Sequence, residues 1–66
     1  MTYGKRYTLT DGSDILTIAE QQGIEVTIWN ADQLLMGTAT YVDIECLSRD
    51  DIKTLDHLLK QQRLNQ

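Results

Sequence analysis

Residues 24–45, IEVTIWNADQLLMGTATYVDIE, decide the fold that this sequence predicts. They hold the only tryptophan of the chain, and apolar and polar side chains alternate over residues 24–30. This period of two predicts a strand over residues 24–30. One face of that strand would carry Ile24, Val26 and Ile28, and the other face would carry Glu25, Thr27 and Trp29.

A second long strand is predicted downstream of this first one. Residues 30–33 are turn formers, and residues 34–44 return as a strand rich in β-branched side chains. Gly37 lies inside this strand and predicts a bulge or a close approach of the backbone. Leu35, Ala39 and Tyr41 would share one face of the strand and lie beside Trp29.

The N-terminal part of the chain allows two interpretations. In one, residues 7–10 form a strand, Asp11 and Gly12 make a two-residue hairpin turn, and residues 13–20 form the returning strand. In the other, Ser13 caps a helix over residues 14–22 that ends at Gly23. The β-branched residues favour the strand, and the helix stays open as the alternative.

A helix over residues 47–63 completes the chain. Ser48 is a suitable N-cap, and Asp51 lies three residues later, as in a capping box. Apolar side chains recur at helical spacing and predict a buried stripe formed by Ile52, Leu55, Leu58 and Leu59.

These elements predict an α+β fold in a single domain spanning residues 1–66. Its architecture would be a small antiparallel β-meander of three to four strands, with one C-terminal helix packed on one face. A chain of 66 residues has a marginal core, so a partner subunit would help to stabilise it. One helix covers only one face of a sheet, so the other face would expose apolar and aromatic side chains.

Charge is distributed unevenly along the chain. The net charge is −4, and residues 7–48 contain no lysine, arginine or histidine. Seven carboxylates lie in this cation-free run: Asp11, Asp14, Glu20, Glu25, Asp32, Asp43 and Glu45. Nucleic-acid binding depends on cations that face phosphates, so direct DNA or RNA binding is disfavoured, and a basic protein partner is favoured.

Few side chains point to chemistry or to a cofactor. One cysteine, Cys46, excludes an internal disulfide, and one histidine, His57, leaves a zinc site without enough ligands. We therefore predict no metal and no cofactor. No apolar run is long enough to span a membrane, and no secretory signal is evident, which favours the cytoplasm.

The sequence thus predicts a non-enzymatic acidic module that docks on a larger protein and modulates or inhibits it. Small acidic proteins of this kind occur among phage-encoded inhibitors, including anti-CRISPR proteins, so the expectation concerns a class and no particular family. The predicted partner-binding residues are Trp29, Tyr41, Leu35, Tyr7, Glu25, Asp32 and Asp43. One alternative is a homodimer or larger homo-oligomer; a second is a small acid-base or metal-dependent enzyme using Asp43, Glu45 and His57.

Overall fold

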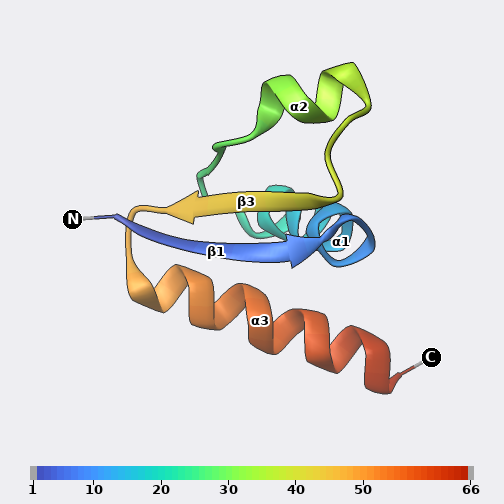
Figure 1. Ribbon diagram of the computed structural model, residues 1–66. Coiled ribbons are helices and arrows are strands. Elements are labelled where there is room, and N and C mark those ends of the chain that lie inside the picture. The colour runs from blue at the N-terminus through green and yellow to red at the C-terminus, as the bar shows by residue number, and fades with distance from the viewer. Residues whose placement is uncertain (1, 66) are drawn as a thin grey trace.

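The computed structural model describes residues 2–65 and contains three strands and three helices over that range (Figure 1). The elements follow one another as β1 (Tyr3–Thr8), α1 (Leu9–Gln22), β2 (Val26–Ile28), α2 (Ala31–Met36), β3 (Tyr41–Cys46) and α3 (Arg49–Leu64). The predicted α+β class, the antiparallel sheet and the C-terminal helix are confirmed. Two further helices, α1 and α2, accompany them.

The three strands form an antiparallel sheet in the order β1-β3-β2, with β3 in the centre. Tyr7 of β1 pairs with Val42 of β3, and Ile28 of β2 pairs with Ile44 of β3. Because β1 and β2 both run antiparallel to β3, they are parallel to each other. Helix α1 therefore crosses from one edge of the sheet to the other, as in a split β-α-β unit.

Helices α1 and α3 pack side by side on one face of this sheet, where each contacts β1 and β3. The side chains of β3 alternate accordingly, because Val42, Ile44 and Cys46 are buried beneath the helices. The core consists of these three residues with Tyr7, Ile15, Ile18, Ala19, Leu55 and Leu59.

Residues 9–22 form helix α1, so the strand predicted over 7–10 is correct only at Tyr7 and Thr8, where β1 ends, and the strand over 13–20 and the turn at Asp11 and Gly12 are wrong. The helical alternative is correct in kind, but the helix begins at Leu9. The hydroxyl of Thr8, and not that of Ser13, accepts a hydrogen bond from the Asp11 N–H at 3.1 Å. Gly23, with φ +71°, ends the helix as expected for that alternative.

Gly12 serves the packing of α1 and not a turn. A Cβ atom at this position would lie 2.6 Å from Cγ2 and 2.7 Å from Cβ of Val42. The absence of a side chain therefore lets α1 approach the central strand closely.

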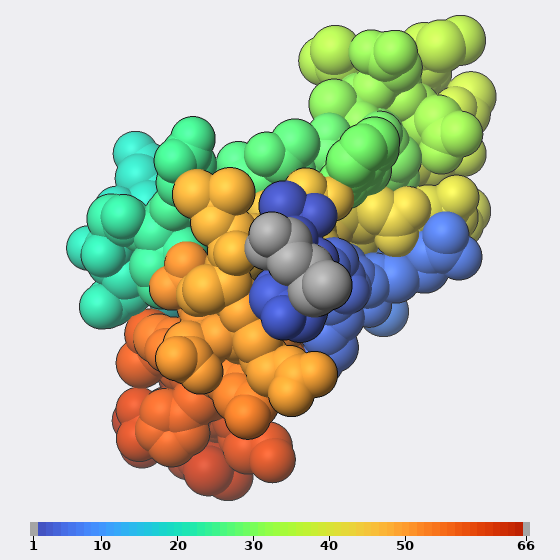
Figure 2. All heavy atoms as spheres, turned by 90° about the vertical axis from the view of Figure 1, so that its left-hand side faces the viewer, coloured from blue at the N-terminus to red at the C-terminus, as the bar shows by residue number. Residues whose placement is uncertain are grey.

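Residues 31–36 form the short helix α2, so the long strand predicted over 34–44 is wrong in its first half. Gly37 adopts φ +74° as the C-cap of α2 and makes no bulge. Leucine and methionine are good helix formers, and the β-branched residues that favour a strand begin only at Thr38. Helix α2 extends away from the body, on the opposite side from α3 (Figures 1 and 2).

Helix α3 agrees with the prediction. The Ser48 hydroxyl accepts a hydrogen bond from the Asp51 N–H at 3.2 Å. The predicted stripe faces the core, with Leu55 and Leu59 buried and Ile52 and Leu58 partly buried. Across residues 2–65, none of the helices combines the length and apolarity that a membrane span requires.

Candidate functional site

The candidate site is the face of the sheet that points away from α1 and α3. We call this surface the open face. Strand alternation places on it the side chains of Arg6, Thr27, Trp29, Tyr41, Asp43 and Glu45. Most of these groups are polar, so the expectation of a sheet that is apolar on both faces is wrong.

Arg6 covers one half of the open face. Its Nε lies 2.9 Å from Oδ1 of Asp43, the residue directly opposite on β3. Its guanidinium carbon lies 3.8 Å from the centroid of the Tyr41 ring. The hydrogen bond to Asp43 is the main cause that raises the pKa of Arg6. Arg6 therefore neutralises Asp43 and covers one side of the Tyr41 ring.

Trp29 occupies the other half of the open face. The indole Nε1–H donates to the carboxylate of Glu45, and the backbone N–H donates to the Asp43 carbonyl at 2.9 Å. The side chain of Trp29 is nevertheless 68 % exposed. The indole is thus fixed along one edge while most of its surface faces solvent.

Asn30 holds this arrangement in place. Its side chain is 8 % exposed, its Nδ2 donates to the Tyr41 carbonyl at 2.7 Å, and its Oδ1 accepts from the Asp43 N–H at 3.0 Å. The side-chain amide of Asn30 therefore makes the hydrogen bonds to β3 that the backbone of a longer β2 would otherwise make. This contact fixes the segment between Trp29 and α2.

A shallow hollow of about 500 Å³ separates Trp29 from Arg6. Its lining includes Gly4, Trp29, Arg6 and Asp43. Gly4 lies opposite Glu45 in the sheet and has no side chain to fill the space between the indole and the guanidinium.

The predicted partner-binding residues do not all gather at this face. Trp29, Tyr41 and Asp43 lie on it. Glu25, just before β2, and Asp32, in the first turn of α2, are exposed. Leu35 is 88 % exposed but belongs to α2, so its predicted place beside Trp29 on a neighbouring strand is wrong. Ala39 lies in the segment between α2 and β3 and not in a strand.

Tyr7 lies on the opposite face of the sheet, and its predicted place beside Trp29 is wrong. It is 6 % exposed, and its hydroxyl donates to Oδ1 of Asp56 on α3 at 2.6 Å. The register explains the error: Tyr7 lies opposite the buried Val42 and points to the helical face, whereas Trp29 follows Ile28 and points to the open face.

Arg6 is the residue of this site that sequence analysis missed. It lies immediately before the cation-free run, and only the pairing of β1 with β3 brings it opposite Asp43. Charge pairing between residues 6 and 43 could have been found from the sequence only if the strand register had been known.

The acidic groups divide into a paired and an unpaired set. Asp11, Asp14, Asp43 and Asp56 form ion pairs with arginine or lysine. Among the described residues, the carboxylates without an ion pair are Glu20, Glu25, Asp32, Glu45, Asp50 and Asp51. Three of these lie in the cation-free part of the chain: Glu25 immediately precedes β2, Asp32 lies in α2, and Glu45 lies in β3.

The groups considered for catalysis are dispersed. His57 is exposed on α3, beyond the sheet from Asp43 and Glu45. Within residues 2–65, no three His, Cys, Asp or Glu side chains are grouped as a metal ion would need. Burial, followed by the nearby carboxylates of Asp51 and Asp56, raises the pKa of Cys46, which disfavours the reactive thiolate.

Comparisons with known proteins assign no function to this chain, so a functional proposal rests on the geometry of the structure. No family model, no curated protein and no solved structure matched this chain significantly.

Proposed function

We propose that this chain is a non-enzymatic interaction module that docks its open face on a larger cytoplasmic protein and modulates or inhibits it. The observation that carries the proposal is the exposed indole of Trp29, held along one edge by Glu45. Tryptophan is among the residues that most often anchor protein interfaces. An indole already fixed in place loses little conformational freedom when a partner covers it.

The charges around Trp29 support a basic partner surface. Glu45 lies beside the indole, and Glu25 and Asp32 are exposed on the neighbouring segments, where no cation of residues 2–65 pairs with them. A complementary basic surface would be steered toward this side of the molecule. A nucleic-acid-binding protein has such a surface, and covering it would block its ligand, as phage-encoded inhibitors of the anti-CRISPR class do.

A second copy of the chain is the alternative occupant of the open face. Self-association would cover Trp29, but it would also bring Glu45 and its acidic neighbours close to the same groups of the other copy. Like charges at an interface oppose association, so a basic partner is favoured. Light scattering during size-exclusion chromatography at tens of micromolar separates a monomer from a homodimer.

The proposal is tested on a nucleic-acid-binding protein that co-purifies with the tagged chain from its host. DNA binding by that purified partner is followed by fluorescence anisotropy while the chain is added. We expect the wild-type chain to displace DNA, and Trp29→Glu to weaken this effect about 30-fold, the consequence of losing a main interface anchor.

Leu64→Glu provides the matched control, because Leu64 is also exposed but lies on α3, beyond the sheet from the open face. This variant should act like wild type, and added salt should weaken wild-type binding. A Trp29→Glu chain that displaces DNA as well as wild type would contradict the proposal, as would displacement that is independent of salt.

A further inference from the structure

Strand β1 forms one edge of the sheet and carries backbone groups that no strand of residues 2–65 pairs. The N–H of Asp43 donates to Asn30, and its C=O accepts from the Trp29 N–H, so both groups point toward the β2 side. Neighbouring residues of a strand alternate in this direction, so Val42 and Ile44 direct their backbone groups toward β1.

The register then identifies the free groups of β1. Val42 and Ile44 bond to Tyr7 and Lys5, which lie opposite them. The intervening residues, Gly4 and Arg6, must direct their N–H and C=O groups outward. The outer edge of β1 can therefore accept one more strand through these two residues.

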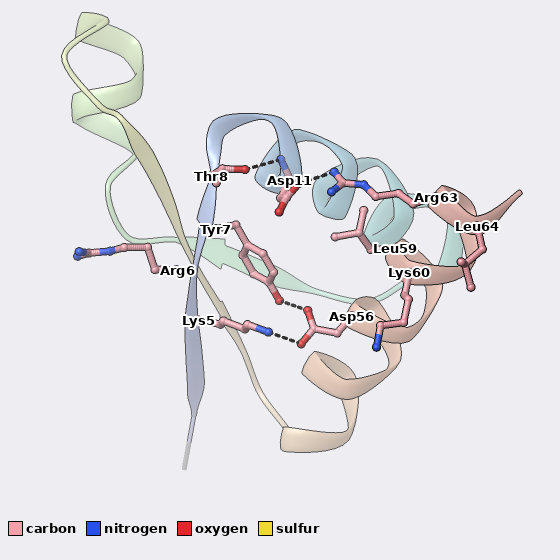
Figure 3. Close-up of a pocket in the computed structure, with 10 residues that line it drawn as sticks. All are labelled: Lys5, Arg6, Tyr7, Thr8, Asp11, Asp56, Leu59, Lys60, Arg63 and Leu64. Carbon is pink, nitrogen blue, oxygen red and sulfur yellow. Dashed lines mark hydrogen bonds and ion pairs between the residues drawn. The ribbon is translucent and has the colours of Figure 1, made fainter. Parts of the chain in front are cut away.

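A groove of about 630 Å³ runs beside this edge, between β1, the start of α1 and the second half of α3 (Figure 3). Tyr7, Leu59 and Leu64 give it an apolar lining. Such an arrangement of an edge strand with a groove against a helix is the geometry by which several domains bind extended peptides.

The groove carries more cationic than acidic side chains, although the chain as a whole is acidic. Of six lysines and arginines, three bring their charge to the groove: Lys5, Lys60 and Arg63. Arg6 lines it only from its place on β1, because its side chain points away to Asp43 on the open face (Figure 3). Two carboxylates line it as well, and both are engaged, because Lys5 lies 2.7 Å from Asp56 and Arg63 pairs with Asp11. Among the described residues Lys60 has no ion-pair partner, so its charge is available to a ligand.

We propose that this groove binds an acidic, extended peptide segment of another protein as an antiparallel fourth strand on β1. The peptide backbone would pair with Gly4 and Arg6. Every second side chain would point toward the groove, with an apolar one against Leu59 and Leu64 and acidic ones on either side, near Lys5 and Lys60. This site is separate from the open face and does not depend on the proposed function.

A second copy of the chain does not suit this edge. Pairing of β1 with β1 of another molecule would bring Lys5 and Arg6 of the two copies together, and like charges in neighbouring strands are destabilising. The surplus of cations in the groove selects an acidic segment instead.

The test uses a synthetic peptide, acetyl-Thr-Glu-Thr-Leu-Thr-Glu-Thr-amide, in which Glu, Leu and Glu share one face of a strand. Binding to the ¹⁵N-labelled full chain is followed by NMR. We expect the amide resonances of Gly4 and Arg6 to shift on titration, with little change at Glu45 on the open face. The same peptide with Lys in place of both Glu should bind about tenfold more weakly or not at all.

Two N-methylated peptides test the strand pairing directly. In an antiparallel pair, side chains of directly opposed residues lie on the same face, so the threonine amides would face β1 and the leucine amide would face solvent. N-methylation of the two central threonines should abolish binding, whereas N-methylation of leucine should leave it unchanged. Equal effects of the two modifications, or the reverse order, would overturn the proposal.

Lys60→Glu and Lys53→Glu form a matched pair of protein variants. Both positions are exposed on α3, but only Lys60 lines the groove. Lys60→Glu should weaken peptide binding about fivefold, and Lys53→Glu should have little effect. A wild-type chain that fails to bind the acidic peptide, or that binds the lysine peptide equally well, would overturn the proposal. Trp29→Glu should bind the peptide normally, which keeps this result separate from that of the open face.

Discussion

At the scale of single residues, neighbouring side chains of β1 bind carboxylates on opposite faces of the sheet. Arg6 binds Asp43 on the open face, and its neighbour Tyr7 binds Asp56 on the helical face. The Nζ atom of Lys5 lies 2.7 Å from Oδ2 of Asp56, so this carboxylate binds two residues of β1. Because the side chains of β1 alternate between the two faces, some of them contact α3 and the others contribute to the candidate site on the open face.

The buried hydroxyl of Tyr7 predicts a loss of stability at alkaline pH. Burial, and then the hydrogen bond to Asp56, raise the pKa of Tyr7 well above the value of about 10 that tyrosine has in an unfolded chain. The neutral hydroxyl therefore makes its full contribution to stability below about pH 10, and this contribution is lost as the pH rises above that value. Urea unfolding followed by circular dichroism at pH 8 to 11 measures the effect.

Tyr7→Phe should unfold more easily than wild type at pH 8, by about 1 kcal/mol, because it lacks the hydrogen bond. Its stability should then decline less steeply between pH 9 and 11. Tyr41→Phe, on the open face, is the control and should keep the wild-type pH dependence. An equally steep decline in Tyr7→Phe would show that another group causes the alkaline loss.

At the scale of elements, the close contact of α1 with β3 decides how the sheet is covered. Helix α1 begins directly after β1, and Gly12 in its first turns lies against Val42 of the central strand. Two helices therefore share the apolar face, with α1 beside α3. The exposed helix α2, by contrast, buries none of its residues and is tied to the sheet through Asn30.

Gly12→Ala should destabilise the protein although alanine is the better helix former. Alanine gains about 1 kcal/mol over glycine inside a helix. The new Cβ would overlap two atoms of Val42, one of them the Cβ next to the β3 backbone, and overpacking of this kind costs about 3 kcal/mol. We expect a net loss of about 2 kcal/mol in urea unfolding.

The exposed neighbour Ser13 provides the control for this substitution. Ser13→Ala changes helix propensity without filling space beneath the helix, so it should leave stability unchanged or raise it slightly. A Gly12→Ala variant that is as stable as Ser13→Ala would mean that α1 does not approach β3 as closely as described.

At the scale of the whole molecule, stability and charge are both distributed unevenly. The sheet, α1 and α3 share one core, whereas α2 lies on the side opposite α3, has no buried residue and contacts the core through the partly buried Leu34. The cations come from β1 and α3, and the unpaired carboxylates beside Trp29 come from the cation-free remainder of the chain. One edge of the sheet is consequently cationic, and the opposite edge and α2 are acidic.

Hydrogen exchange should reveal this gradient of stability. Local opening is easiest where few buried apolar contacts hold an element, so the amides of α2 should exchange fastest among the helices. The amides of Val42 and Ile44 in the central strand should exchange slowest, near the rate set by global unfolding. NMR-detected exchange at several pH values gives these rates. Protection in α2 equal to that in β3 would contradict this account.

The sequence alone determined those features that depend on neighbouring residues. Ser48 and the stripe of leucines defined α3, because caps and helical spacing are local signals. Alternation placed Val26 and Ile28 on the helical face and Trp29 on the opposite one, and the α+β class followed from these two elements. The run without cations was likewise evident from the sequence.

Only the tertiary structure decided the features that depend on contacts between distant residues. Thr8 to Gly23 contain signals for both strand and helix, and the helix prevails because it buries Ile15, Ile18 and Ala19 against β3 and α3. The segment that leads into helix α2 is tied to β3 by the side chain of Asn30, a contact between residues distant in the sequence. Arg6 reaches Asp43 through strand register, which depends on pairing across 37 residues and leaves no local trace in the sequence.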